Sequence, residues 1–206
     1  MIADAQNELE RAVRFLAKLD PALGGAVRQF GMPNARRRPP GFATLVKIIV
    51  GQQISTKAAE AIWKRCRSTL GTVNAKAVRT AKDADLRAAG LSASKLKTLK
   101  AIASAVETGT CNFRGFNRKT DTEVKTQLTA IWGIGDWTAD IYLMFGMGRP
   151  DAWPVGDLAL RTGWQAITKS SQRIDAEDLA SIAERWSPHR SAAAVLLWHA
   201  VAATRT

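Results

Sequence analysis

The stretch that most constrains the fold of this chain is a pair of apolar helical segments separated by Gly133-Ile134-Gly135. Apolar residues follow helical spacing up to Trp132, and the same spacing resumes from Trp137. Glycine permits a positive φ and a close approach of backbones, so the two glycines predict a sharp reversal with Ile134 packed between the helices. The N–H groups of Gly133 and Gly135 and the start of the second helix would then face outward. This arrangement predicts an anion-binding turn.

Helical spacing also dominates the rest of the chain, and no strand-like alternation, internal repeat or low-complexity tract stands out. The pattern and the capping residues predict helices at 4–19, 21–30, 42–50, 55–70, 75–81, 83–89, from 94 onward, at 158–167, 175–186 and 191–203. A length of 206 residues is enough for one sizeable core. The sequence therefore predicts an all-α fold in a single domain, residues 1–206.

The charge of the chain points to a polyanionic partner. There are 30 Lys and Arg residues against 18 Asp and Glu, which gives a formal net charge of +12. A basic folded protein most often meets nucleic acid and less often an anionic membrane, although a basic surface also occurs without either partner. Arg36, Arg37 and Arg38 lie in a Pro-rich turn. They are candidates for phosphate contacts, with a solvated loop as the alternative.

Cysteine usage and apolar runs exclude several classes of protein. Cys66 and Cys111 lie far apart without a C-x-x-C partner, which weighs against zinc sites and disulfide scaffolds. The longest apolar runs are too short or too polar at their flanks to span a membrane. The N-terminus has early acidic residues and no basic region before an apolar core, which argues against a signal peptide. We therefore expect an intracellular, cytoplasmic protein without membrane association.

The hairpin and the loop that follows it resemble the helix-hairpin-helix (HhH-GPD) DNA glycosylase superfamily. The resemblance rests on the hairpin at about 128–146, and on the loop Trp153-Pro154-Val155-Gly156-Asp157, which places Asp157 22 residues after Gly135. Less specific similarity extends from Phe42 to Trp198, and the nearest subfamily is the DNA-3-methyladenine glycosylase II type. The resemblance implies a compact two-lobed all-α fold without a β domain. The N- and C-terminal helices would form one lobe and the central helices with the hairpin the other, with the active-site cleft between them.

The resemblance assigns the catalytic role to Asp157. To cleave an N-glycosidic bond, such an enzyme takes the nucleotide out of the stack and stabilises an oxocarbenium-like transition state. One carboxylate can do this electrostatically or by orienting water. Local sequence alone favours a helix N-cap for Asp157, and its distance from the hairpin reverses that preference. Trp137 stands where bifunctional relatives carry a lysine that forms a Schiff base, so we expect hydrolysis without AP lyase activity.

Trp137 and Trp198 match aromatic positions of the base pocket in the alkylated-base subfamily. An electron-rich indole face attracts a cationic methylated purine, by about 1–2 kcal/mol when desolvated. Ile141 and Leu158 stand where we would expect further aromatic residues, which leaves the substrate range open.

The resemblance also implies which groups contact DNA. The expected residues are Gly133, Gly135, Thr138, Gln52, Gln53 and Arg190. Gln52 and Gln53 are the candidates for filling the gap that an extruded base leaves, and the alternative is that they only bridge the turn after 42–50. A monovalent cation, Na or K, is implied at the backbone carbonyls of Thr129, Ile131 and Ile134. The four-cysteine iron–sulfur cluster of some relatives is not expected, because no cysteine follows Cys111.

Together these features predict a monofunctional glycosylase that removes alkylated purines such as N3-methyladenine from DNA in base excision repair. It would require no cofactor, bind damaged double-stranded DNA as a monomer and, in a prokaryote, associate with the nucleoid. Two alternatives remain open. One is a glycosylase for deaminated or mismatched bases, which calls for a polar pocket. The other is a non-catalytic hairpin module whose DNA binding does not depend on Asp157.

Overall fold

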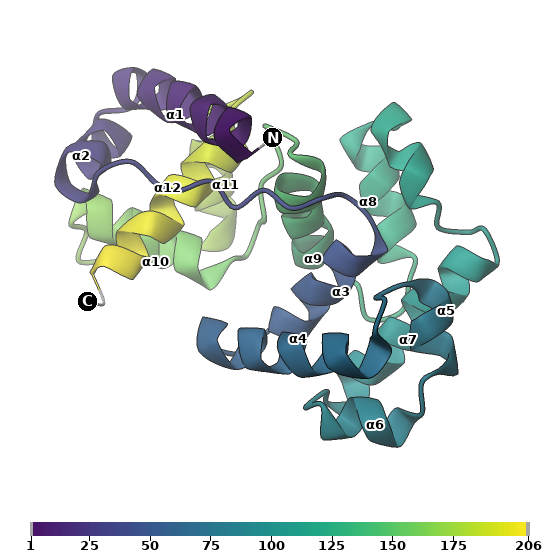
Figure 1. Cartoon of the computed structure of the whole chain (residues 1–206). Coiled ribbons are helices and arrows are strands. Elements are labelled where there is room, and N and C mark those ends of the chain that lie inside the picture. Colours follow the sequence, from purple (N-terminus) through teal and green to yellow (C-terminus); the bar gives the residue numbers. More distant parts are fainter. Residues whose placement is uncertain (1, 205–206) are drawn as a thin grey trace. The chain divides into compact units, whose positions relative to one another are not determined.

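The computed structural model describes residues 2–204, and over this range it consists of helices joined by turns and loops (Figure 1). The predicted all-α class is confirmed. The chain separates into two compact units. Unit 1 combines the N-terminal stretch through Arg37 with the stretch from Gly148 onward, and unit 2 is Arg38–Met147. Between residues 2 and 204, every helix is too short or too polar to cross a lipid bilayer.

Unit 1 is built around its last helix. Its helices are α1 (Ile2–Leu19), α2 (Pro21–Phe30), α10 (Leu158–Thr168), α11 (Ala176–Glu184) and α12 (Arg190–Ala203). The run from Ala192 to Leu197 on α12 is buried, because α12 is apolar on all sides and packs against α1, α2 and α10. Asp20 is 3% exposed and caps α2 through the N–H of Ala22 at 2.9 Å. Its other oxygen accepts hydrogen bonds from Arg185 at 2.7 Å and from the indole of Trp186 at 2.8 Å, which compensates its burial.

Unit 2 is built around α3. Its elements are α3 (Phe42–Gly51), α4 (Thr56–Leu70), α5 (Ala75–Thr80), α6 (Asp83–Ala88), α7 (Ala93–Glu107), η1 (Phe113–Arg118), α8 (Asp121–Thr129), α9 (Asp136–Ile141) and η2 (Tyr142–Met147). The α3 residues Leu45, Val46, Ile49 and Val50 are buried, and α3 packs against α4, α7, α9 and η2. Burial of such branched side chains stabilises each by roughly 1.5–3 kcal/mol, so α3 anchors both the turn after it and the hairpin.

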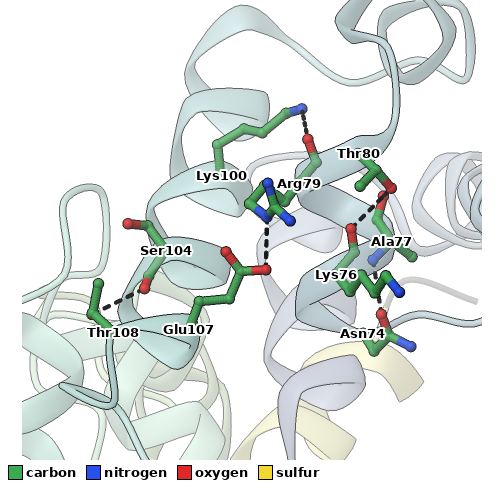
Figure 2. A network of polar contacts seen from close by, with 9 residues as sticks. All are labelled: Asn74, Lys76, Ala77, Arg79, Thr80, Lys100, Ser104, Glu107 and Thr108. Carbon is green, nitrogen blue, oxygen red and sulfur yellow. Dashed lines mark hydrogen bonds and ion pairs between the residues drawn. The ribbon is translucent and has the colours of Figure 1, made fainter.

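Polar contacts join α5 to α7 on the surface of unit 2. Figure 2 shows the guanidinium of Arg79 donating from Nε to Glu107 at 2.7 Å, and the ammonium of Lys100 donating to the carbonyl of Arg79 at 3.1 Å. Lys100 also donates to the carbonyl of Ala81 at 2.9 Å, so it caps the C-terminal end of α5. Exposed pairs of this kind contribute little one by one, and their effect here is to hold a two-turn helix in place.

The main departure from the predicted helices lies after the hairpin. The apolar segment that begins at Trp137 does not form one α-helix, because α9 changes at Tyr142 into a π-helical turn, η2. The hydroxyl of Tyr142 accepts a hydrogen bond from the N–H of Gly41 at 2.8 Å. Gly146 allows the Tyr142 ring to pack closely, since a Cβ there would lie 3.0 Å from that ring. The segment between α7 and α8 contains the 3₁₀ helix η1.

Candidate active site

The turn of the hairpin has the predicted backbone. Gly133 has φ +84°, and a Cβ at this position would lie 2.1 Å from the Thr98 hydroxyl on α7. Ile134 is 5% exposed and therefore packed, as expected. Gly135 is the N-cap of α9 and carries no side chain that could cap it, and a Cβ there would meet nothing within 4 Å. The start of α9 is thus open to a ligand backbone, as an anion-binding turn requires.

An ion pair fixes the two helices of the hairpin against each other. The ammonium of Lys125 on α8 lies 3.1 and 3.0 Å from the two carboxylate oxygens of Asp140 on α9. Asp136, at the start of α9, lies 3.5 Å from the same ammonium. Asp140 is only 4% exposed, so its charge needs such a partner. Sequence reasoning did not identify this pair, although both residues lie on predicted helices.

The turn between α3 and α4 is tied to the hairpin. Gln52 donates from its amide to the hydroxyl of Thr138 on α9 at 2.7 Å. The ammonium of Lys95 on α7 donates to the carbonyls of Val50 and Gln52, both at 2.8 Å, and burial lowers the pKa of Lys95. Gln53, by contrast, is exposed and has φ +56°. The structure therefore distinguishes the two candidates, because the Gln52 side chain supports the turn while Gln53 lies at the surface.

Asp157 lies where a tight loop meets α10. The N–H of Val155 bonds to the carbonyl of Trp153 at 2.9 Å, the N–H of Asp157 bonds to the carbonyl of Pro154 at 3.2 Å, and Gly156 has φ +84°. Asp157 is the N-cap of α10, and its Oδ1 accepts the N–H of Leu160 at 3.0 Å. The expected cap is therefore present. The positive end of the helix stabilises a negative charge at this position.

Trp198 contacts the same carboxylate oxygen. Its indole Nε1 donates to Asp157 Oδ1 at 3.1 Å across 41 residues of sequence. The contact depends on the close packing of α10 against α12, where a Cβ at Gly163 would lie 2.6 Å from the carbonyl of Leu197. Sequence reasoning expected Trp198 in the base pocket and did not expect this hydrogen bond. No local pattern could have shown it, because it arises from the packing of two helices.

Arg190, expected at the DNA interface, binds a carboxylate of its own unit. Its Nε and Nη2 donate to the two oxygens of Asp151 at 3.0 and 2.8 Å, and its N–H donates to Oδ1 at 3.2 Å. Burial raises the pKa of Asp151, but hydrogen bonds from Arg190 and Ser187 outweigh burial and hold it below its ordinary value. Asp151 is thus a structural turn residue. A DNA contact by Arg190 stays a prediction.

Two further expected sites concern the hairpin. Trp137 is half-buried on α9, and its pocket role stays a prediction. Of the expected cation ligands Thr129, Ile131 and Ile134, the carbonyl of Ile131 accepts the N–H of Ile134 at 3.1 Å. The cation site stays a prediction. Within residues 2–204, no cluster of three or more His, Cys, Asp or Glu side chains is placed to hold a metal ion.

Known proteins share both the sequence and the fold. The model of the "HhH-GPD superfamily base excision DNA repair protein" matches residues 46–189. DNA-3-methyladenine glycosylase 1 of Schizosaccharomyces pombe is 32% identical over 199 residues, which cover 93% of this chain and 87% of the relative. The solved 3-methyladenine DNA glycosylase of the same yeast in complex with abasic DNA has a TM-score of 0.85 at 30% identity, and the match covers 91% of this chain and 95% of that one. A DNA-3-methyladenine glycosidase from Bacillus halodurans has a TM-score of 0.74 at 30% identity, covering 90% and 91%. The chain belongs to the HhH-GPD superfamily of base excision DNA repair proteins.

Proposed function

We propose that this protein is a monofunctional DNA glycosylase that hydrolyses the N-glycosidic bond of alkylated purines such as N3-methyladenine. The observation that carries the proposal is the placement of Asp157. Its carboxylate is held at the N-terminal end of α10 by the N–H of Leu160 and by the indole N–H of Trp198. The similarity to proteins named DNA-3-methyladenine glycosylase supports the choice of substrate.

The chemistry follows from a fixed anion beside the sugar. When the glycosidic bond breaks, its electron pair leaves with the base, and positive charge develops on C1′ and the ring oxygen. A preorganised carboxylate beside the sugar stabilises this charge more than it stabilises the uncharged sugar of the ground state. A water molecule then attacks C1′ and loses a proton, which leaves an abasic site. A cationic N3-methylated purine departs as a neutral base, so a single carboxylate suffices without a strong general acid.

The absence of lyase activity rests on Trp137. Strand cleavage by a bifunctional glycosylase needs an amine that attacks C1′ and forms a Schiff base. An indole nitrogen is not such a nucleophile, and its ring offers an apolar face for a cationic base instead. We therefore expect the product to keep an intact phosphodiester backbone until alkali or another enzyme cleaves it.

The hairpin and the turn after α3 would bind the DNA. The open start of α9 at Gly135 suits a phosphate, and the net charge of +12 suits a polyanion. Gln53 is the better candidate for filling the gap left by the extruded base, because it is exposed on a left-handed turn while the Gln52 amide is bonded to Thr138. A monovalent cation on the hairpin carbonyls would bridge the turn to a phosphate.

The test is base release from duplex DNA methylated by a simple alkylating agent. Wild type should release methylpurines and give strand breaks only after alkali, and Asp157→Asn should release almost none. Asparagine also caps helices well, so this variant should stay folded and still bind DNA. If wild type binds DNA but releases no methylpurine, the alkylbase assignment is wrong, and deaminated and mismatched duplexes become the next substrates. Breaks without alkali would refute the monofunctional assignment.

A further inference from the structure

A basic pocket lies at the opposite end of α3 from the turn that carries Gln53. It has a volume of about 660 Å³ and is lined by the segment just before α3, the first turns of α3 and the C-terminal end of α4 with the turn that follows it. We call it the Arg38 pocket. Because α3 has 10 residues, its two ends lie about 15 Å apart. The pocket is therefore separate from the hairpin and from the turn that we expect to meet the damaged base.

Cationic side chains in this pocket exceed the carboxylates available to them. Arg38, Lys47 and Arg67 line it. Lys47 pairs with Glu60 at 2.8 Å. Neither guanidinium, of Arg38 or of Arg67, forms an ion pair or a side-chain hydrogen bond within residues 2–204. Two planar donors are thus left for an anion that comes from outside the chain.

An aromatic ring lies among these charges. The half-buried ring of Trp63 lines the Arg38 pocket, and the Lys47 ammonium lies 5.7 Å from its centroid. The Trp63 indole N–H donates no hydrogen bond within the described chain. A flat ring beside two unpaired guanidinium groups matches a ligand in which planar groups alternate with negative charges.

A second hollow continues the pocket along α4. It has a volume of about 530 Å³ and shares Trp63, Arg67 and Gly71 with the Arg38 pocket. It adds the exposed side chain of Lys64 and the carboxylate of Glu60, which pairs with Lys47. Positions three apart lie on one face of a helix, so Lys64 and Arg67 form one stripe on α4, which ends just before the C-cap Gly71. The charged surface is therefore elongated, as a polymeric ligand requires.

We propose that the Arg38 pocket and this stripe form an accessory site for a nucleic-acid strand, in which phosphates bind Arg38 and Arg67 and a base lies against Trp63. Positive grooves with accessible aromatic rings bind single strands in this way without sequence preference. An acidic peptide would satisfy the charges but would not use the ring. The site allows the enzyme to hold a second DNA segment while the hairpin holds the first. It goes beyond the proposed function and does not depend on Asp157.

The first test measures binding at Trp63. The indole N–H resonance of Trp63, assigned as the one lost in Trp63→Phe, should shift when a five-nucleotide oligothymidylate is added to the full chain. In the double variant Arg38→Ala with Arg67→Ala, the affinity should fall at least about tenfold. The matched control is Arg87→Ala with Arg118→Ala, which removes two exposed arginines of the same unit and should change the affinity less than about twofold.

The same titration distinguishes the source of the phosphate. Thymidine monophosphate and inorganic phosphate should bind more weakly than the oligonucleotide, because they use one phosphate contact. If thymidine monophosphate binds as tightly as the oligonucleotide, the ligand of the pocket is a free nucleotide and not a strand, and the proposal is overturned. If a poly-glutamate peptide shifts the Trp63 resonance and binds as tightly as the oligonucleotide, the proposal is overturned in favour of an acidic protein. The proposal would also be overturned if the Trp63 resonance does not shift, or if the two double variants bind the oligonucleotide with equal affinity.

The second test measures transfer between DNA molecules. Dissociation of wild type from a labelled duplex should speed up as unlabelled duplex is added, because a second segment binds before the first leaves. The Arg38/Arg67 double variant should lose this dependence, while its single-turnover base release stays within about twofold of wild type, since neither residue touches the reacting groups. A dependence that persists in the variant would contradict the proposal. Failure of wild type to release any base would refute only the proposed function.

Discussion

Replacing Trp198 with phenylalanine tests whether its indole N–H positions the carboxylate of Asp157, the proposed catalytic group. The change keeps an aromatic ring of similar shape and removes the donor that lies 3.1 Å from Asp157 Oδ1. The N–H of Leu160 stays at 3.0 Å on the same oxygen, so α10 keeps its cap. The expected defect therefore lies in the chemical step and not in folding.

The size of the defect follows from the bond that is lost. A hydrogen bond to a charged group contributes roughly 1.5–3 kcal/mol. At about 1.4 kcal/mol per factor of ten, base release from methylated duplex under single-turnover conditions should slow about 10- to 150-fold. DNA binding should change less than about threefold, because the ring that would face the base remains.

The matched control is Trp164→Phe. Trp164 is a half-buried tryptophan of α10 that packs 5.5 Å from the ring of Trp186 and donates no indole hydrogen bond within the described residues. This control should keep nearly the full rate. A Trp198→Phe enzyme with a wild-type rate, alongside an inactive Asp157→Asn enzyme, would show that the bond does not position the carboxylate. A rise in KM without a fall in kcat would instead assign Trp198 to base binding alone.

Three other predictions concern the hairpin of unit 2 and the Asp151–Arg190 pair of unit 1. Gly133→Ala should lower the free energy of unfolding by about 2 kcal/mol or more, because Gly133 has a positive φ and an added Cβ would collide with Thr98. The control Gly135→Ala should change the free energy of unfolding by less than about 0.5 kcal/mol in the same denaturant titration, because an added Cβ there meets nothing within 4 Å. Lys125→Met should destabilise the fold by about 1–3 kcal/mol because Asp140 stays buried, and an unchanged melting temperature would contradict this. Because the folded pKa of Asp151 lies below its ordinary value, its contribution to stability is complete above that value and is lost as pH falls through the folded pKa. The difference in free energy of unfolding between wild type and Asp151→Asn should therefore become smaller below about pH 4. A difference that does not change with pH would show that the charge of Asp151 does not stabilise the fold.

Much of the fold could be predicted because its signals are local. Asp20, Ser55 and Asp175 each stand directly before a helix and accept a backbone N–H of its first turn. Gly133 and Ile134 likewise determine the turn through their own conformation and apolarity. Capping and periodicity act over a few residues, so they can be recognised in the sequence without knowing the rest of the fold.

The contacts that complete the site are not local, and sequence patterns could not predict them. Trp198 reaches Asp157 across 41 residues, and Lys95 bonds to the carbonyl of Gln52 across 43 residues. Both contacts follow from how helices pack, which depends on side-chain volumes along the whole interface. The base-pocket role that the resemblance implies for Trp198 stays a prediction, and the hydrogen bond from its indole N–H to Asp157 follows from the packing of α10 against α12.

The division of unit 1 between the two ends of the chain affects when activity can arise during synthesis. Unit 2 is continuous from Arg38 to Met147, so its residues emerge from the ribosome together and can fold early. Unit 1 must wait for α12, because α1, α2 and α10 all pack against that last helix. Trp198 lies on α12 and tethers Asp157, so this tether can form only after α12 has been synthesised. A nascent chain can therefore acquire its hairpin before the Asp157 carboxylate gains its bond to Trp198.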